Sequence, residues 1–276
     1  KAIEINPKHA IAYYNRGHAS YGKEDDDKVI ADFTKAIEIN PKYADAYCNR
    51  SVVWEKKGDN DKVIADNTKA IEINPKLANA YFNRGNARAK KSKYEKAIAD
   101  YTKAIEIDPK LANAYFNRGN AWANKSKYEK AIADYTKALE INPRFASAYY
   151  GRGIAWKRKG DYDKTVTDYT KAIETDSKLA NAYAGLAWFM ATCPEGRYRD
   201  GKRAVELAEK ALKLEETGDI LAVLAAAYAE AGRFQEAIET MERAIMKIKQ
   251  EGRTKDLPNY KELLPSYKAG RPWREK

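Results

Sequence analysis

The sequence predicts an all-α fold, an α-solenoid of antiparallel helix pairs, and three observations support this prediction. Prolines stand 34 residues apart, at Pro7, Pro41, Pro75, Pro109 and Pro143, and a period of this length indicates stacked repeats. Each repeat contains two segments whose apolar residues recur three and four positions apart, which is the amphipathic helix pattern. A short linker such as KSK or KGD separates the two segments, so the helices must be antiparallel neighbours.

The repeat boundaries follow from the alanine three residues after each proline. This numbering predicts five regular repeats, at 10–43, 44–77, 78–111, 112–145 and 146–179. A sixth repeat at 180–217 has a longer loop between its helices, and a weaker seventh covers 218–251. Residues 1–9 resemble the end of a second helix, and we expect them to be the end of a truncated preceding repeat. Residues 252–276 are expected to form a capping helix and a tail, because terminal repeats of solenoids need a polar cap.

Within a repeat, positions are counted from its first alanine, and the two helices are expected at about positions 2–14 and 17–30. The second helix ends before the proline because a residue that precedes proline resists the α conformation. Small residues recur where helices must touch, with Gly85 and Gly119 at position 8 and Ala104 and Ala138 at position 27. Aromatic residues recur at positions 4 and 11, and we expect them to fill the space between the helices.

This set of positions resembles the tetratricopeptide repeat (TPR), which has aromatics at positions 4, 11 and 24, Gly at 8, Ala at 20 and 27 and Pro at 32. The resemblance covers about residues 1–250. It implies a right-handed superhelix in which the first helices line a concave groove. The chain departs from the pattern at position 7, where the first five repeats have Arg and not Leu, and at position 24 of the second repeat, which is Asn67.

Asparagines recur on the side of the first helix that faces away from its partner helix. On a helical wheel this side carries positions 2, 6, 9 and 13. The asparagines of position 6 are Asn15, Asn49, Asn83 and Asn117, and those of position 9 are Asn86 and Asn120. An asparagine side chain offers one acceptor and two donors, which match a peptide group. A row of them can bind the backbone of an extended peptide, and the TPR resemblance implies the same, since some TPR superhelices use an asparagine ladder. The alternative is that duplication copied a tolerated surface residue.

Aromatic and basic residues accompany the asparagines. Phe82, Phe116 and Tyr150 stand at position 5 and could form apolar pockets, and Lys56, Lys90 and Arg158 stand at position 13 and could favour acidic side chains. The net charge of +11 also favours acidic partners. The predicted partner is therefore a protein or peptide segment that is extended and bears acidic or aromatic residues.

The carboxylate clamp, by which some TPR domains bind chaperone C-termini, is a more specific function that the resemblance suggests. The best register offers Asn86 and Asn117, but it places Phe82, Ser147 and Gly151 where the clamp needs basic residues. We therefore predict that a complete clamp is absent.

Arginine and aspartate co-occur sixteen residues apart in the first five repeats. The arginines at position 7 are Arg16, Arg50, Arg84, Arg118 and Arg152. The aspartates at position 23 are Asp32, Asp66, Asp100, Asp134 and Asp168. Both are missing from the sixth repeat, which has Leu186 at position 7. We expect partly buried Arg–Asp pairs with a structural role.

Catalysis has little support in the sequence. The two histidines and two cysteines do not form a cluster with metal-ligand spacing, and no glycine-rich phosphate loop is present. We therefore expect no enzymatic activity, no cofactor and no metal. Cys193 could be a reactive thiol, although a bystander is the simpler interpretation. The low cysteine count favours a reducing compartment such as the cytoplasm, and no apolar run is long enough to cross a membrane.

Two alternatives to peptide binding remain open at this point. Some helical repeat proteins bind RNA one base per repeat, and this chain is basic. Against this, a lysine at position 26 stands three residues before a glutamate at position 29 in the first five repeats, a spacing typical of a solvated helix face. The second alternative is an architectural role with self-association through an exposed terminal repeat.

Overall fold

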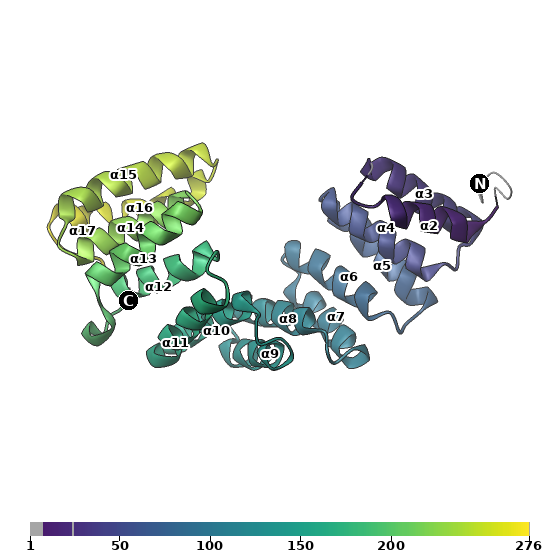
Figure 1. Ribbon diagram of the computed structural model, residues 1–276, viewed down its shortest axis with the longest axis horizontal. Coiled ribbons are helices and arrows are strands. Elements are labelled where there is room, and N and C mark those ends of the chain that lie inside the picture. Colours follow the sequence, from purple (N-terminus) through teal and green to yellow (C-terminus); the bar gives the residue numbers. More distant parts are fainter. Residues whose placement is uncertain (1–7, 24, 276) are drawn as a thin grey trace. The chain divides into compact units, whose positions relative to one another are not determined.

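The computed structural model describes residues 8–23 and 25–275, and every regular element in these ranges is helical. Most of the partial repeat expected at 1–9 therefore lies outside the described residues. The chain divides into two compact blocks, the N-terminal block Lys1–Pro143 and the C-terminal block Arg144–Lys276. Figure 1 shows that each block consists of helices joined in hairpins.

Within the described residues 8–23 and 25–143, the N-terminal block contains four helix pairs. Its helices are α2 (Ala10–Ser20), α3 (Asp26–Ile39), α4 (Ala44–Lys56), α5 (Asn60–Ile73), α6 (Ala78–Lys90), α7 (Tyr94–Ile107), α8 (Ala112–Asn124) and α9 (Tyr128–Ile141). The helices α4, α6 and α8 each pack against the second helix of their own repeat and against the second helix of the repeat before. This consecutive packing within the block is that of an α-solenoid.

The C-terminal block continues the helix pairs and ends in shorter elements. Its elements are α10 (Ala146–Lys159), α11 (Tyr162–Thr175), α12 (Ala180–Thr192), η1 (Gly196–Tyr198), α13 (Gly201–Leu214), α14 (Gly218–Glu230), α15 (Phe234–Gln250), η2 (Thr254–Asp256), α16 (Leu257–Lys261) and α17 (Leu264–Lys268). The long loop of the sixth repeat contains η1. Both α16 and α17 pack against α15.

The C-terminal cap differs from the single helix that the sequence suggests. It consists of two short helices, and each has a proline in its first turn, Pro258 in α16 and Pro265 in α17. Proline has no N–H to donate to the preceding turn, so α16 cannot continue through Pro265. Leu263 and Tyr267 are buried against Met241 and other residues of α14 and α15, which covers the apolar side of the last helix pair.

The second helices of the N-terminal block end as the prolines predict. Their C-cap residues, Asn40, Asn74, Asp108 and Asn142, all have extended backbone angles near φ −130° and ψ 90°. The Asn40 side chain also accepts a hydrogen bond of 3.1 Å from the Lys42 N–H, and Asn74 and Asp108 make the equivalent bond. The turn into the next repeat is therefore fixed by proline and by the residue before it.

The glycine at position 8 allows a tyrosine of the second helix to pack against the first. A Cβ atom added at Gly85 would lie 2.7 Å from Cε1 of Tyr101, and one added at Gly119 would lie 2.8 Å from Cε1 of Tyr135. Both rings are almost completely buried. In the second repeat the pair is Ser51 and Asn67, so the larger residue at position 8 coincides with a smaller residue at position 24.

The predicted Arg–Asp pairs are confirmed. Arg118 binds Asp134 through two parallel hydrogen bonds, Nε to Oδ2 at 2.8 Å and Nη2 to Oδ1 at 2.7 Å. The other four predicted pairs are likewise within hydrogen-bond distance. Arg118 Nη1 also donates to Thr102 of the preceding repeat at 3.0 Å, and Arg50 and Arg84 bind Thr34 and Thr68 in the same way. Each such arginine therefore joins two neighbouring repeats.

Candidate functional site

A groove of about 400 Å³ lies in the N-terminal block between the third and fourth repeats. Its lining includes four residues that the sequence analysis selected, Asn86, Asn117, Asn120 and Lys90. The other lining residues are Glu55, Ala89, Tyr94, Tyr101, Ala121 and Asn124. The structure therefore brings Asn86 and Asn120 of position 9 together with Asn117 of position 6 on one surface, made mainly by α6 and α8.

Hydrogen bonds fix the orientation of the three asparagines in this groove. Asn86 Oδ1 accepts from the hydroxyl of Tyr101 at 3.0 Å and from Asn117 Nδ2 at 2.9 Å. Asn120 Oδ1 accepts from the hydroxyl of Tyr135 at 2.7 Å. Within residues 8–23 and 25–275, the Nδ2 groups of Asn86 and Asn120 and the Oδ1 of Asn117 have no hydrogen-bond partner. The groove thus presents two amide donors and one amide acceptor.

The remaining asparagines of position 6 lie outside this groove. Asn49 Nδ2 donates to the Tyr14 hydroxyl at 2.9 Å, and Asn83 Nδ2 lies 3.8 Å from Cys48 Sγ. Asn49 lines a smaller cavity of about 160 Å³ together with His18 and Phe33, and Asn15 is exposed on α2. Asn49, Asn83 and Asn117 therefore all donate to a side chain of the preceding repeat, so the row has a packing role as well as an exposed surface.

The aromatic residues of position 5 each pack against the tyrosine at position 24 of their own repeat. The ring of Phe82 lies 6.0 Å from that of Tyr101, and Phe116 lies 5.8 Å from Tyr135. In the C-terminal block, Tyr150 lies 5.5 Å from Tyr169. All three position-5 residues are only partly exposed, so they contribute more to the core than to open apolar pockets.

Two of the three basic residues of position 13 form ion pairs with acidic side chains. Lys56 Nζ lies 2.8 Å from Asp26 Oδ1, and Lys90 Nζ lies 2.7 Å from Glu55 Oε1. The acidic partners stand at positions 17 and 12, which the helical wheel did not assign to the groove. Arg158, in the C-terminal block, is exposed and lines a cavity of about 280 Å³ with Tyr150 and Trp188.

The asparagine row ends with Asn117 of the fourth repeat, and position 6 is Gly151 in the fifth repeat and Gly185 in the sixth. A Cβ atom at Gly185 would lie 2.7 Å from Cε2 of Tyr150. An asparagine cannot occupy this position unless the tyrosine moves. Both residues belong to the C-terminal block, so its first helices present a different surface from those of the N-terminal block.

The lysine–glutamate pairs of the second helices also form. The five Nζ to Oε2 distances between positions 26 and 29 run from 2.7 to 3.1 Å. These side chains are about half exposed, so each pair adds little stability. The pairs leave this helix face with balanced charge, which disfavours RNA binding through it.

The two cysteines are expected to resist alkylation in the folded protein. Both are buried, and burial raises the pKa of the Cys48 thiol to about 11 and also raises that of Cys193. At pH 8 about one Cys48 thiol in a thousand is then ionised, and only the thiolate reacts. Mass spectrometry after iodoacetamide treatment should find both cysteines unmodified in buffer and both modified in urea. Modification of either at the rate of a free thiol would contradict this expectation.

Residues 8–23 and 25–275 contain neither a membrane-spanning helix nor a cluster of metal ligands. None of the helices there is long and apolar enough to cross a lipid bilayer. The same residues place no group of three His, Cys, Asp or Glu side chains in a position to bind a metal ion.

The hydroxyl groups that bind the position-7 arginines and the position-9 asparagines were not predicted from the sequence. Thr34, Thr68 and Thr102 recur at position 25 and bind the arginine of the next repeat. Tyr101 and Tyr135 bind the position-9 asparagines of their own repeats. The sequence holds one indication of the tyrosine–asparagine pairs. The second repeat lacks both residues, since it has Val52 at position 9 and Asn67 at position 24.

Models of one repeat family match the chain at several places. Models described as tetratricopeptide repeat match residues 10–43, 112–145, 67–99 and 195–252. A further model described as TPR repeat matches residues 85–126. The comparison with curated protein sequences gives no significant match.

Several solved structures share the fold. A tetratricopeptide repeat protein from Parabacteroides merdae superposes with a TM-score of 0.69 at 20% identity, covering 94% of this chain and 98% of that one. A MamA protein gives a TM-score of 0.56 at 26% identity, covering 62% and 93%. YrrB, a TPR protein with an unusual peptide-binding site, gives 0.58 at 23% identity, covering 66% and 93%.

Proposed function

We propose that this chain, which belongs to the tetratricopeptide repeat family, binds an extended peptide segment of a partner protein in the groove between α6 and α8. TPR arrays are in general scaffolds for protein interactions, and the family matches support that general role for this chain. The observation that carries the finer proposal is the set of three amide groups, on Asn86, Asn117 and Asn120, that face the groove in fixed orientations.

The chemistry of these groups suits a peptide backbone. An extended peptide offers carbonyl acceptors and N–H donors in alternation, and the groove offers two donors and one acceptor. Because such bonds do not depend on the peptide's side chains, the groove would select for extended conformation rather than for a fixed sequence. Lys90 forms an ion pair with Glu55, so it adds little to a preference for acidic peptides. Such a preference would rest mainly on the net charge of +11.

The test compares a groove variant with a matched surface variant. The groove variant is Asn86→Ala, Asn117→Ala, Asn120→Ala, and the control is Lys69→Ala, Lys103→Ala, Lys137→Ala on the second helices. A pull-down from lysate with the wild-type chain identifies a partner, and overlapping peptides from that partner locate the bound segment. Fluorescence anisotropy then gives the affinity of that peptide for each protein, after circular dichroism has confirmed folding.

We expect the groove variant to bind the peptide roughly 10-fold or more weakly, since each lost hydrogen bond contributes about 0.5–1.5 kcal/mol. The control should change the affinity less than about twofold. Equal affinities for the wild type and the groove variant would refute the proposal. The affinity should also depend only shallowly on salt, whereas an RNA ligand would dissociate steeply as salt rises.

A further inference from the structure

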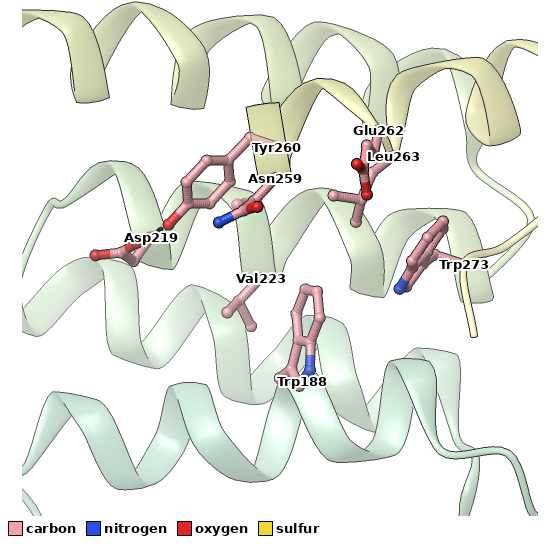
Figure 2. Close-up of a pocket in the computed structure, with 9 residues that line it drawn as sticks. Trp188, Asp219, Val223, Asn259, Tyr260, Glu262, Leu263 and Trp273 are labelled. Atoms are coloured by element: carbon pink, nitrogen blue, oxygen red, sulfur yellow. Dashed lines mark hydrogen bonds between the residues drawn. The ribbon is translucent and has the colours of Figure 1, made fainter. Parts of the chain in front are cut away.

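A cavity of about 280 Å³ lies on the first helices of the C-terminal block. Its wall comes from α10, α12 and α14, together with Tyr169 of α11. Figure 2 shows two of the lining side chains, Trp188 of α12 and Val223 of α14, directed toward each other. The volume lies just below the range of about 300–1,000 Å³ that is usual for small-molecule sites. The cavity is therefore suited to a small ligand or to one side chain of a larger one.

The hydroxyl of Tyr169 lacks the hydrogen bond that the equivalent tyrosines make. Tyr101 and Tyr135 also stand at position 24, and each donates to the asparagine at position 9 of its own repeat. In the fifth repeat, position 9 is Ile154, whose side chain has no acceptor. Tyr169 is 2% exposed, and its hydroxyl has no hydrogen-bond partner among the described residues. A ligand that brings an acceptor into the cavity would therefore satisfy a buried donor.

A second tyrosine places another hydroxyl at the same cavity. The ring centroids of Tyr150 and Tyr169 are 5.5 Å apart, and the Tyr150 hydroxyl also has no partner in the described part of the chain. Gly185 leaves room for the Tyr150 ring, since a Cβ atom there would lie 2.7 Å from Cε2. Burial raises the pKa of both hydroxyls, so both are protonated donors at neutral pH.

Arg158 brings a positive charge to these two hydroxyls. It is exposed, lines the cavity and forms no ion pair within residues 144–275. Burial is the main cause of the raised pKa of the Tyr169 hydroxyl, and the charge of Arg158 acts in the opposite direction. This interaction places the guanidinium near the hydroxyl. A cation and two neutral donors thus share one small cavity.

The other two charged residues of the lining already have ionic partners. Lys157 Nζ lies 3.0 Å from Glu275 Oε1. Asp219 Oδ2 lies 2.6 Å from Arg253 Nη1, and Asp219 also accepts a hydrogen bond from the hydroxyl of Tyr260, which Figure 2 shows directed at it. The charge that the lining leaves for a ligand is therefore positive.

We propose that this cavity binds the carboxylate of a small organic acid, with the apolar part of the acid against Ile154, Trp188 and Val223. Two hydroxyl donors and a guanidinium match the acceptors and the charge of a carboxylate. A free acid and a glutamate side chain of a peptide both supply this group. The site belongs to the C-terminal block alone, so its failure would leave the peptide groove of α6 and α8 unaffected.

The experiment adds 3-phenylpropionate to the full chain labelled with ¹⁵N and follows the indole N–H signals by NMR. The signal of Trp188, identified with the variant Trp188→Phe, should shift because this side chain lines the cavity. The signals of Trp54 and Trp122 in the N-terminal block should stay in place. The matched control ligand is the neutral amide 3-phenylpropionamide, which should bind about 10-fold or more weakly because it lacks the charge.

Two substitutions assign the binding to the proposed donors. Arg158→Gln should weaken binding of the acid about 10-fold or more and leave binding of the amide unchanged. Tyr169→Phe keeps the buried ring and should weaken binding of the acid severalfold. The matched control is Arg243→Gln, which removes an exposed arginine of α15 outside the cavity and should change neither affinity.

A further ligand distinguishes the two sources of the carboxylate. N-acetyl-glutamate N-methylamide presents the glutamate side chain as a peptide does. Tighter binding of this compound than of 3-phenylpropionate would indicate a peptide residue as the ligand, and weaker binding would indicate a free acid.

Two results would overturn the proposal. One is a Trp188 signal that does not move at millimolar concentrations of either acid. The other is equal binding of 3-phenylpropionate and its amide, or equal binding of the acid by the wild type and by Arg158→Gln. Either equality would make this an apolar cavity without a carboxylate site.

Discussion

Replacing Asp100 with alanine is expected to lower the free energy of unfolding of the third repeat by about 3–5 kcal/mol, the usual cost of breaking a buried ion pair from one side. The Asp100 side chain is 4% exposed and binds two guanidinium groups. Arg84 Nη2 lies 2.8 Å from Oδ1, and Arg88 Nη1 lies 2.6 Å from Oδ2. The substitution leaves both cations largely buried without their counter-ion.

The loss should be concentrated near the substitution, because each repeat of a solenoid contacts only its neighbours. Hydrogen exchange should show that α6 and α7 open more readily, and urea unfolding followed by circular dichroism should show a lower midpoint. The control is Glu106→Ala, which removes the exposed partner of Lys103 and should cost less than about 1 kcal/mol. Similar losses for Asp100→Ala and Glu106→Ala would mean that the buried pair is not a main source of stability.

Replacing Gly119 with serine is expected to cost about 1–3 kcal/mol, because the new side chain overpacks the interface between α8 and α9. Its Cβ would lie 2.8 Å from Cε1 of Tyr135 and 3.3 Å from the carbonyl oxygen of Ala131. Tyr135 is 2% exposed, so its ring can move only if neighbouring side chains shift, and its hydroxyl is bound to Asn120.

A double-mutant cycle that introduces the residue pair of the second repeat, serine at position 8 and asparagine at position 24, tests this explanation. Tyr135→Asn alone should cost about 3–5 kcal/mol by leaving a cavity. Combined with Gly119→Ser it reproduces Ser51 and Asn67, whose amide donates to the Val63 carbonyl at 2.8 Å. We therefore expect a favourable coupling of about 1–3 kcal/mol in urea unfolding. Strictly additive losses would show that position 8 and position 24 do not constrain each other.

The sequence by itself determined the helices and the contacts that repeat within one helix pair. The 34-residue period placed the prolines that end the second helices, and the observed C-caps at Asn40, Asn74 and Asp108 follow from them. The Arg118–Asp134 pair and its four equivalents were also predictable. Two residues sixteen apart in a helical hairpin are brought together by a short linker, and their joint loss in the sixth repeat identified them as partners.

The tertiary structure alone decided the properties of the groove. Lys90 is neutralised by Glu55, which stands 35 residues earlier, and the orientation of Asn86 is set by Tyr101 and Asn117 from two different helices. In the C-terminal block, Lys157 Nζ donates to Glu275 Oε1, although the two residues are 118 positions apart in the sequence. A helical wheel describes one helix, whereas these contacts arise between side chains of different repeats. Their partners are fixed by how the helices stack, so the charge and hydrogen-bonding capacity of the surface could not be obtained from periodicity.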